Sequence, residues 1–102
     1  MVNGTETEIW LEHRFVHSPG TWWVRLPGRP AIACARESET RTHEELIAIA
    51  TRIAAHHDAV DATCNVLSAR WPGSTIVVEM DGSVTANRIT RRGQMLLETV
   101  IP

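Results

Sequence analysis

The sequence predicts a small α+β domain with a three-stranded antiparallel meander, one long or broken helix packed on it, and a C-terminal β-hairpin. Three observations predict this fold. Apolar and polar residues alternate early in the chain, as they do in half-buried strands. A capping box at Thr42 opens a stretch with helical spacing. An Asp-Gly pair at 81–82 separates two segments that are rich in strand-forming residues.

Size and composition are those of one folded domain. The chain has 102 residues, of which 43% are apolar and 22% are charged, close to the average for globular proteins. No apolar run approaches the roughly 20 residues that cross a bilayer. Residues 1–8 are polar and acidic, whereas a signal peptide begins with basic and then apolar residues. We therefore expect one cytoplasmic domain over residues 1–102, with a disordered tail at 1–7.

Net charge and cysteine content bear on the expected partners and on whether disulfides are expected. A formal charge of -2 does not give the broad positive field typical of nucleic-acid binders, so nucleic acid is not the expected partner. No membrane partner is expected either, because no apolar run is long enough to cross a bilayer. Two cysteines, Cys34 and Cys64, do not make a disulfide framework, and we expect both to be reduced and buried. No motif in the sequence indicates a cofactor.

The first strand is predicted over residues 8–17. Ile9 and Leu11 fall on one face of this segment, and Trp10 falls on the other face together with Glu12 and Arg14. Ser-Pro-Gly at 18–20 then predicts a turn, because Pro restricts φ and Gly accepts a positive φ.

Two further strands complete the expected meander. Residues 21–26 are dense in β-forming residues, with Trp22 and Trp23 on opposite faces. Pro-Gly-Arg-Pro at 27–30 ends this strand. Residues 31–35 predict a third, shorter strand.

The helix start is the clearest local signal. Thr42 and Glu45 match a capping box, in which each side chain binds the backbone amide of the other residue. Apolar residues then recur in steps of four and three, as one face of a helix requires. This seam consists of Leu46, Ala50, Ile53, His57, Val60, Cys64, Leu67 and Trp71.

The length of the helical region has two interpretations. One helix could run from Thr42 to about Arg70, as the spacing favours. Alternatively, a helix ends near His57, and a loop over residues 58–61 leads to a second short element. A helix of nearly 30 residues is long on base rates, so we favour two pieces or one bent helix. Trp-Pro-Gly-Ser at 71–74 ends the region in either case.

The C-terminal hairpin is predicted from residues 75–80 and 83–89. Asp81 and Gly82 between them favour a type I′ turn, in which both central residues take a positive φ. Residues 94–101 are apolar enough to dock as either a strand or a helical turn, and the sequence favours neither.

One family resemblance extends over about residues 8–58. The segment Gly-Thr-Trp-Trp-Val-Arg-Leu-Pro-Gly at 20–28, a short strand, and then Thr-His-Glu-Glu-Leu at 42–46 resemble the N-terminal domain of HicB-type antitoxins. The resemblance implies a partial RNase H-like β-β-β-α-β unit and an antitoxin-like or phage-type regulator. No helix-turn-helix or ribbon-helix-helix segment follows it.

Histidine-containing patterns offer weak metal and catalytic candidates. His57 and Asp61 share a helical face at i, i+4, but a metal needs further ligands, and only His13, His17 and Cys64 are visible. We therefore expect no metal site. A small enzyme or ligand-binding domain would use His13, His17, His43 or His57 in a pocket, although the chain has no nucleophile elbow and no phosphate-binding loop.

Arg88, Arg91 and Arg92 form the one basic cluster of the sequence. A basic hairpin tip can contact phosphates, which gives a third functional hypothesis, nucleic-acid binding. No aromatic side chain lies among the three arginines, as single-strand binding would favour.

The tryptophans are the basis of the hypothesis that we favour, which is binding to another protein. Trp22 and Trp23 are neighbours in one strand, so their side chains must leave opposite faces, and a sheet covered by one helix has one dry face. Either the later hairpin or a second subunit covers the other indole, or it stays exposed as a binding site. We expect a non-enzymatic protein-binding module, a homodimer or a partner complex, that binds through Trp10, Trp22, Trp23 and Arg25.

Overall fold

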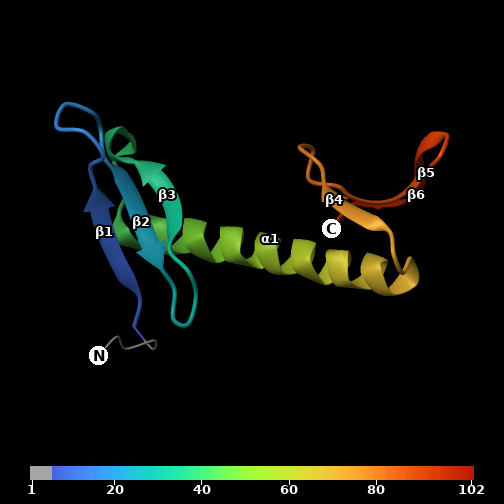
Figure 1. Ribbon diagram of the computed structural model, residues 1–102. Coiled ribbons are helices and arrows are strands. Elements are labelled where there is room, and N and C mark those ends of the chain that lie inside the picture. Colours follow the sequence, from blue (N-terminus) through green and yellow to red (C-terminus); the bar gives the residue numbers. More distant parts are fainter. Residues whose placement is uncertain (1–5) are drawn as a thin grey trace. The chain divides into compact units, whose positions relative to one another are not determined.

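The structure is a computed structural model that describes residues 6–102. Its elements follow the order β1–β2–β3–η1–α1–β4–β5–β6, which confirms the predicted α+β class (Figure 1). The chain divides into two compact units, Met1–Ala54 and Ala55–Pro102, and the boundary falls inside helix α1 (His43–Arg70). The expectation of a single domain stays a prediction. The expected tail at 1–7 lies outside the described residues except for Glu6 and Thr7, which belong to no helix or strand.

The first unit contains the predicted meander. Strands β1 (Glu8–Glu12), β2 (Thr21–Arg25) and β3 (Ile32–Arg36) form an antiparallel sheet in the order β1-β2-β3. Trp10 of β1 lies directly opposite Trp23 of β2. The register between β2 and β3 shifts between Trp22 and Trp23, so that Trp22 pairs with Ala35 and Trp23 with Ala33.

The first strand is shorter than predicted. It ends at Glu12 rather than near His17, because Glu12 pairs with Thr21, the first residue of β2, and residues 13–20 have no strand to pair with. The 3-10 turn η1 (Glu37–Glu39) holds this connection in place. The Glu37 carboxylate accepts a hydrogen bond from the Gly20 amide at 3.1 Å and lies 3.0 Å from His13 Nε2.

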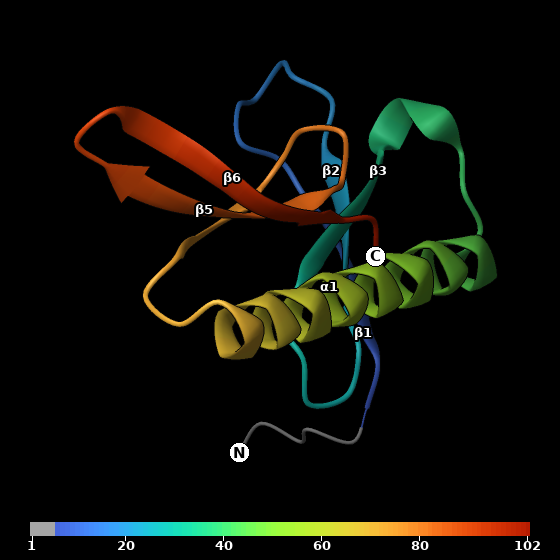
Figure 2. The same cartoon turned by 90° about the vertical axis from the view of Figure 1, so that its right-hand side faces the viewer.

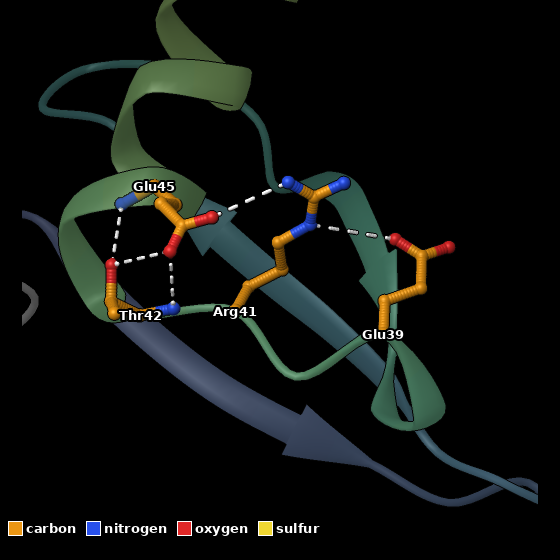
Figure 3. A network of polar contacts seen from close by, with 4 residues as sticks. All are labelled: Glu39, Arg41, Thr42 and Glu45. Carbon is orange, nitrogen blue, oxygen red and sulfur yellow. Dashed lines mark hydrogen bonds and ion pairs between the residues drawn. The ribbon is translucent and has the colours of Figure 1, made fainter.

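The capping box forms as predicted at the start of α1 (Figure 3). The Glu45 amide donates to Thr42 Oγ1 at 3.1 Å, and the Thr42 amide donates to the Glu45 carboxylate at 3.4 Å. Arg41 lies between Glu39 and Glu45 and forms an ion pair with each. The hydrogen bond from the Thr42 amide, aided by Arg41, lowers the pKa of Glu45 below its usual value.

The alternative of two helical pieces separated by a loop was wrong. Helix α1 is one continuous element of 28 residues. No Pro or Gly interrupts it, and its seven alanines have the highest helix propensity of any residue, so residues 58–61 continue the helix rather than forming a loop. The turn at 71–74 ends it, with Gly73 at a φ of 79°.

Each unit has its own hydrophobic core on a different part of α1. In the first unit the buried residues are Val24, Ala35, Leu46 and Ala50. In the second unit they are Val60, Leu67, Val84 and Ala86. Between these two sets the helix is exposed from residue 55 to residue 59, including His57. The predicted apolar seam is therefore interrupted at His57, where the side chain faces solvent.

The second unit contains a second antiparallel sheet, in the order β4-β5-β6. Strand β4 (Thr75–Val78) and strand β5 (Val84–Thr90) form the predicted hairpin. Strand β6 (Gly93–Val100) pairs with β5, so the segment whose structure the sequence left open is a strand. No helix among residues 6–102 has the length and apolar character that a membrane crossing requires.

The turn between β4 and β5 differs from the predicted type I′ turn. Gly82 has a φ of 89°, but Asp81 does not take a positive φ. The Gly82 amide donates to the Glu79 carbonyl, and the Glu79 amide donates to the Ser83 carbonyl, so the loop is longer than two residues. The Asp81 carboxylate accepts hydrogen bonds from the Ser83 hydroxyl and amide, which lower the pKa of Asp81. These bonds stabilise a negative φ at Asp81 that the Asp-Gly pair alone does not predict.

Glu98 of β6 joins the end of α1 to the second sheet. Its carboxylate accepts a hydrogen bond from Trp71 Nε1 at 2.9 Å and forms an ion pair with Arg70. The Trp71 bond, followed by the Arg70 bond, lowers the pKa of Glu98 below its usual value. The ionised carboxylate is therefore the form that stabilises the folded state.

We predict a pH-dependent loss of stability at Glu98. A carboxyl whose pKa is lower in the folded chain stabilises it above the unfolded-state pKa, and this contribution is lost as the pH falls through the folded-state pKa. Glu98→Gln should lower the thermal unfolding midpoint at neutral pH, and the difference from wild type should shrink in acid. Circular dichroism melts across this range measure it, with Glu6→Gln as the control. A difference that grows in acid would contradict the prediction.

Candidate functional site

The two faces of the first sheet differ in what covers them. The first half of α1 packs on one face, where Leu46 and Ala50 contact the side of the sheet that carries Val24 and Trp22 (Figures 1 and 2). Trp10 and Trp23 leave the other face, and each is only partly buried. The geometry that the alternation predicted, two neighbouring indoles on opposite faces, is present in the sheet.

The guanidinium group of Arg25 lies over the ring of Trp10. The guanidinium carbon of Arg25 is 5.2 Å from the centre of the Trp10 ring, a cation–π distance. Arg25 also donates to the Glu8 carboxylate at 3.0 Å. These contacts hold the Arg25 side chain over the indole, so this part of the face is ordered before any partner arrives.

Trp23 lines an open hollow of about 300 Å³ at the end of the same face. Polar and apolar side chains line the hollow together, among them one acidic and one basic residue. Its lining residues are Glu12, Arg14, Pro19, Thr21, Trp23 and Ala33. Tryptophan is enriched at binding hot spots, so the indole of Trp23 at this open hollow makes the hollow a candidate contact point for another protein.

The structure brings together three of the four predicted binding residues, Trp10, Trp23 and Arg25. Trp22 instead faces α1, where its ring meets the His43 ring edge-on at 6.0 Å between centres. Trp22 therefore belongs to the packing of the first unit.

Sequence reasoning did not select the remaining lining residues of the hollow. The alternation of residues 8–17 does place Glu12 and Arg14 on the same face as Trp10, so these two residues could have been predicted from the sequence. Pro19 and Ala33 carried no signal, because the turn after β1 and the register shift beside Trp23 bring them to the hollow.

His57 and Asp61, the candidate metal ligands, have no third ligand placed to complete a metal site with them among residues 6–102. His57 and Asp61 both lie on exposed parts of α1. Among residues 6–102, no three His, Cys, Asp or Glu side chains gather closely enough to hold a metal ion.

The predicted histidines do not share a site. In the first unit His13 contacts Glu37, and His43 contacts Trp22. His17 is exposed in the loop after β1, and His57 is exposed on α1. The hollow at Trp23 is lined by none of the four.

The cysteine thiols are free and partly buried. Cys34 Sγ donates to the Ile32 carbonyl at 3.4 Å. Burial is the main reason that the pKa of Cys34 is raised, so its thiol is protonated at neutral pH rather than a nucleophilic thiolate.

The arginine cluster lies in the second unit. Arg88 is in β5, and Arg91 and Arg92 form the turn between β5 and β6. All three side chains are exposed.

Comparison of the chain with protein-family models, curated proteins and solved structures gives no match. The two sheets themselves therefore supply the observations from which a function can be proposed.

Proposed function

We propose that this chain is a non-enzymatic protein-binding module whose binding surface is the open face of the β1–β3 sheet. The observation that carries the proposal is the cross-strand pair of Trp10 and Trp23 on the face opposite α1. Both indoles are partly exposed, and Trp and Arg are the residues most enriched at binding hot spots.

The arrangement of charges favours a protein as the partner of this face. Arg25 is ordered over Trp10 by its ion pair with Glu8, which reduces the entropy that the side chain loses on binding. Glu12 and Arg14 place both signs of charge beside the Trp23 hollow. Charged side chains of both signs beside an indole suit a protein surface, which also presents both signs.

The HicB-type resemblance extends the proposal to an antitoxin-like or phage-type regulator. The resemblance includes the strand with both tryptophans, so the same face would hold the toxin or a second copy of the chain. We place the module in the cytoplasm, where free thiols such as those of Cys34 and Cys64 stay reduced. A toxin-like reading frame directly beside the gene would support this role.

Loss of the Trp23 side chain should weaken partner binding by about 2 kcal/mol, or roughly 30-fold, as is usual for a hot spot. Sedimentation velocity over a range of concentrations measures self-association. Affinity capture with the full chain as bait identifies a different partner, whose affinity is then measured by calorimetry. Trp10→Ala should act in the same direction.

Met80→Ala is the matched control, because Met80 is a fully exposed apolar residue in the β4–β5 turn of the other unit. It should leave binding unchanged. The proposal fails if the chain stays monomeric at every concentration and captures no protein whose binding depends on Trp10 or Trp23. It also fails if Met80→Ala and Trp23→Ala weaken binding equally.

A further inference from the structure

The β5 and β6 strands extend beyond the rest of their sheet. Strand β4 pairs with β5 only as far as Asn87, which lies opposite Thr75. From Arg88 onward β5 pairs with β6 alone, and the last pair is Thr90 with Gly93. Every residue from 88 to 96 is exposed, and we call this two-stranded ribbon the arm.

The arm concentrates positive charge in a chain that is acidic as a whole. It contains Arg88, Arg91 and Arg92, and no carboxylate lies between Asp81 and Glu98 in the sequence. The rest of the chain holds seven arginines against twelve carboxylates. Among residues 6–102, no carboxylate forms an ion pair with any of the three arm guanidinium groups. The arm is therefore free to bind an anionic partner.

Exposed apolar side chains lie beside these cations. Ile89 is 75% exposed, Leu96 is 61% exposed and Met95 is 47% exposed, and all three are within the arm. Arg88 pairs with Met95 on one face of the ribbon. The other face carries Ile89, which pairs with Gln94, together with Leu96. A partner of the arm must therefore offer anionic groups together with apolar surface.

We propose that the arm binds a nucleic-acid duplex. Guanidinium groups bind phosphate oxygens in a bidentate manner, and the sugars and base edges between the phosphates supply apolar contact for Ile89, Met95 and Leu96. A two-stranded ribbon is narrow enough to enter the major groove of B-form DNA. The arm has no aromatic side chain on which unpaired bases could stack, so a duplex suits it better than a single strand.

The negative net charge, which made nucleic acid an unexpected partner from the sequence, does not oppose this binding. Charges farther from the phosphates than a Debye length, about 8 Å at physiological salt, are largely screened. The local charge of the arm therefore contributes more to duplex binding than the net charge of the chain does. This inference is independent of the protein-binding proposal, since its residues lie in the other unit.

Salt-dependent binding of the full chain to a labelled duplex of mixed sequence tests the arm, by fluorescence anisotropy. Three phosphate contacts predict that the logarithm of the association constant falls with the logarithm of salt concentration with a slope of about -2 to -3. The double variant Arg91→Ala, Arg92→Ala should weaken binding at low salt and reduce the slope by about 2. Arg91→Lys with Arg92→Lys should keep most of the slope, because the charge is retained.

Arg52→Ala is the control, because Arg52 is an exposed arginine on α1 outside the arm. It should leave affinity and slope unchanged. Parallel titrations of duplex DNA and duplex RNA show which duplex supplies the phosphates, and tighter binding to DNA is expected because the A-form major groove is too narrow for a ribbon. The proposal is overturned by absence of duplex binding at low salt, or by an equal effect of Arg52→Ala. Tighter binding to a single strand, or binding to anionic lipid vesicles without duplex binding, also overturns it.

Discussion

Leu67→Ala should destabilise the β4–β6 sheet by about 2 to 5 kcal/mol, the usual cost of truncating a fully buried leucine. Leu67 has no exposed surface and lies in the core of the second unit with Val60, Val84 and Ala86. Truncation removes buried apolar surface and leaves a cavity that alanine cannot fill. Strands β4, β5 and β6 lose the main apolar contact with α1 that this residue supplies.

Hydrogen exchange followed by mass spectrometry measures where the loss occurs. Amides of β4–β6 should lose protection well before those of β1–β3, because the two cores lie on separate stretches of α1. Val66→Ala is the matched control, since Val66 is the preceding residue of the helix and is 51% exposed. It should change stability by less than about 0.5 kcal/mol. Equal loss of protection in both sheets would show that the two cores unfold as one domain.

Leu46→Ala should have the reciprocal effect, about 2 to 5 kcal/mol on the first unit. Leu46 directly follows Glu45 of the capping box, is fully buried and packs with Val24, Ala35 and Ala50. Without it, the start of α1 loses its main contact with the sheet, and the open face loses the support that holds Trp10 and Trp23 in register.

Exchange protection should fall first in β1–β3 and in the first turns of α1. Thr51→Ala is the control, because Thr51 is exposed on α1 and its hydroxyl only donates to the Ile47 carbonyl of the same helix. The variant also separates fold from function. If partner binding survives unchanged in a chain whose first unit has lost protection, the β1–β3 face is not the binding surface.

The proposed protein-binding face and the proposed arm lie in different units, so their variants should act independently. Trp23→Ala should leave duplex binding unchanged, and the arm double variant should leave protein binding unchanged. A regulator that binds a protein through one sheet and a duplex through the other would carry both surfaces on one continuous helix.

Local signals predicted most of the elements. Alternation over residues 21–26 predicted β2, and the reciprocal bonds of Thr42 and Glu45 predicted the first turn of α1. These features depend on residues close in sequence, through side-chain alternation or short-range hydrogen bonds, and such interactions are readable without knowing the rest of the fold. The wrong predictions concern features that depend on pairing with a segment distant in the sequence, such as the residue at which a strand ends. β1 stops at Glu12 because β2 begins at Thr21, which no pattern within residues 8–17 reveals.

For the candidate binding residues too, the sequence predicted some features and only the tertiary structure decided others. The alternation of side chains along a strand determined that Trp22 and Trp23 leave opposite faces. The order of residues determined that the arginine cluster lies next to Gly93. Only the folded chain decided which indole meets α1, that Arg25 lies on Trp10, and that the register shift brings Ala33 to Trp23. Likewise, only the end of β4 opposite Asn87 leaves the arginines on a free two-stranded ribbon. Side-chain direction follows from the geometry of a single strand, whereas contact and exposure depend on which strands and helices pack against it.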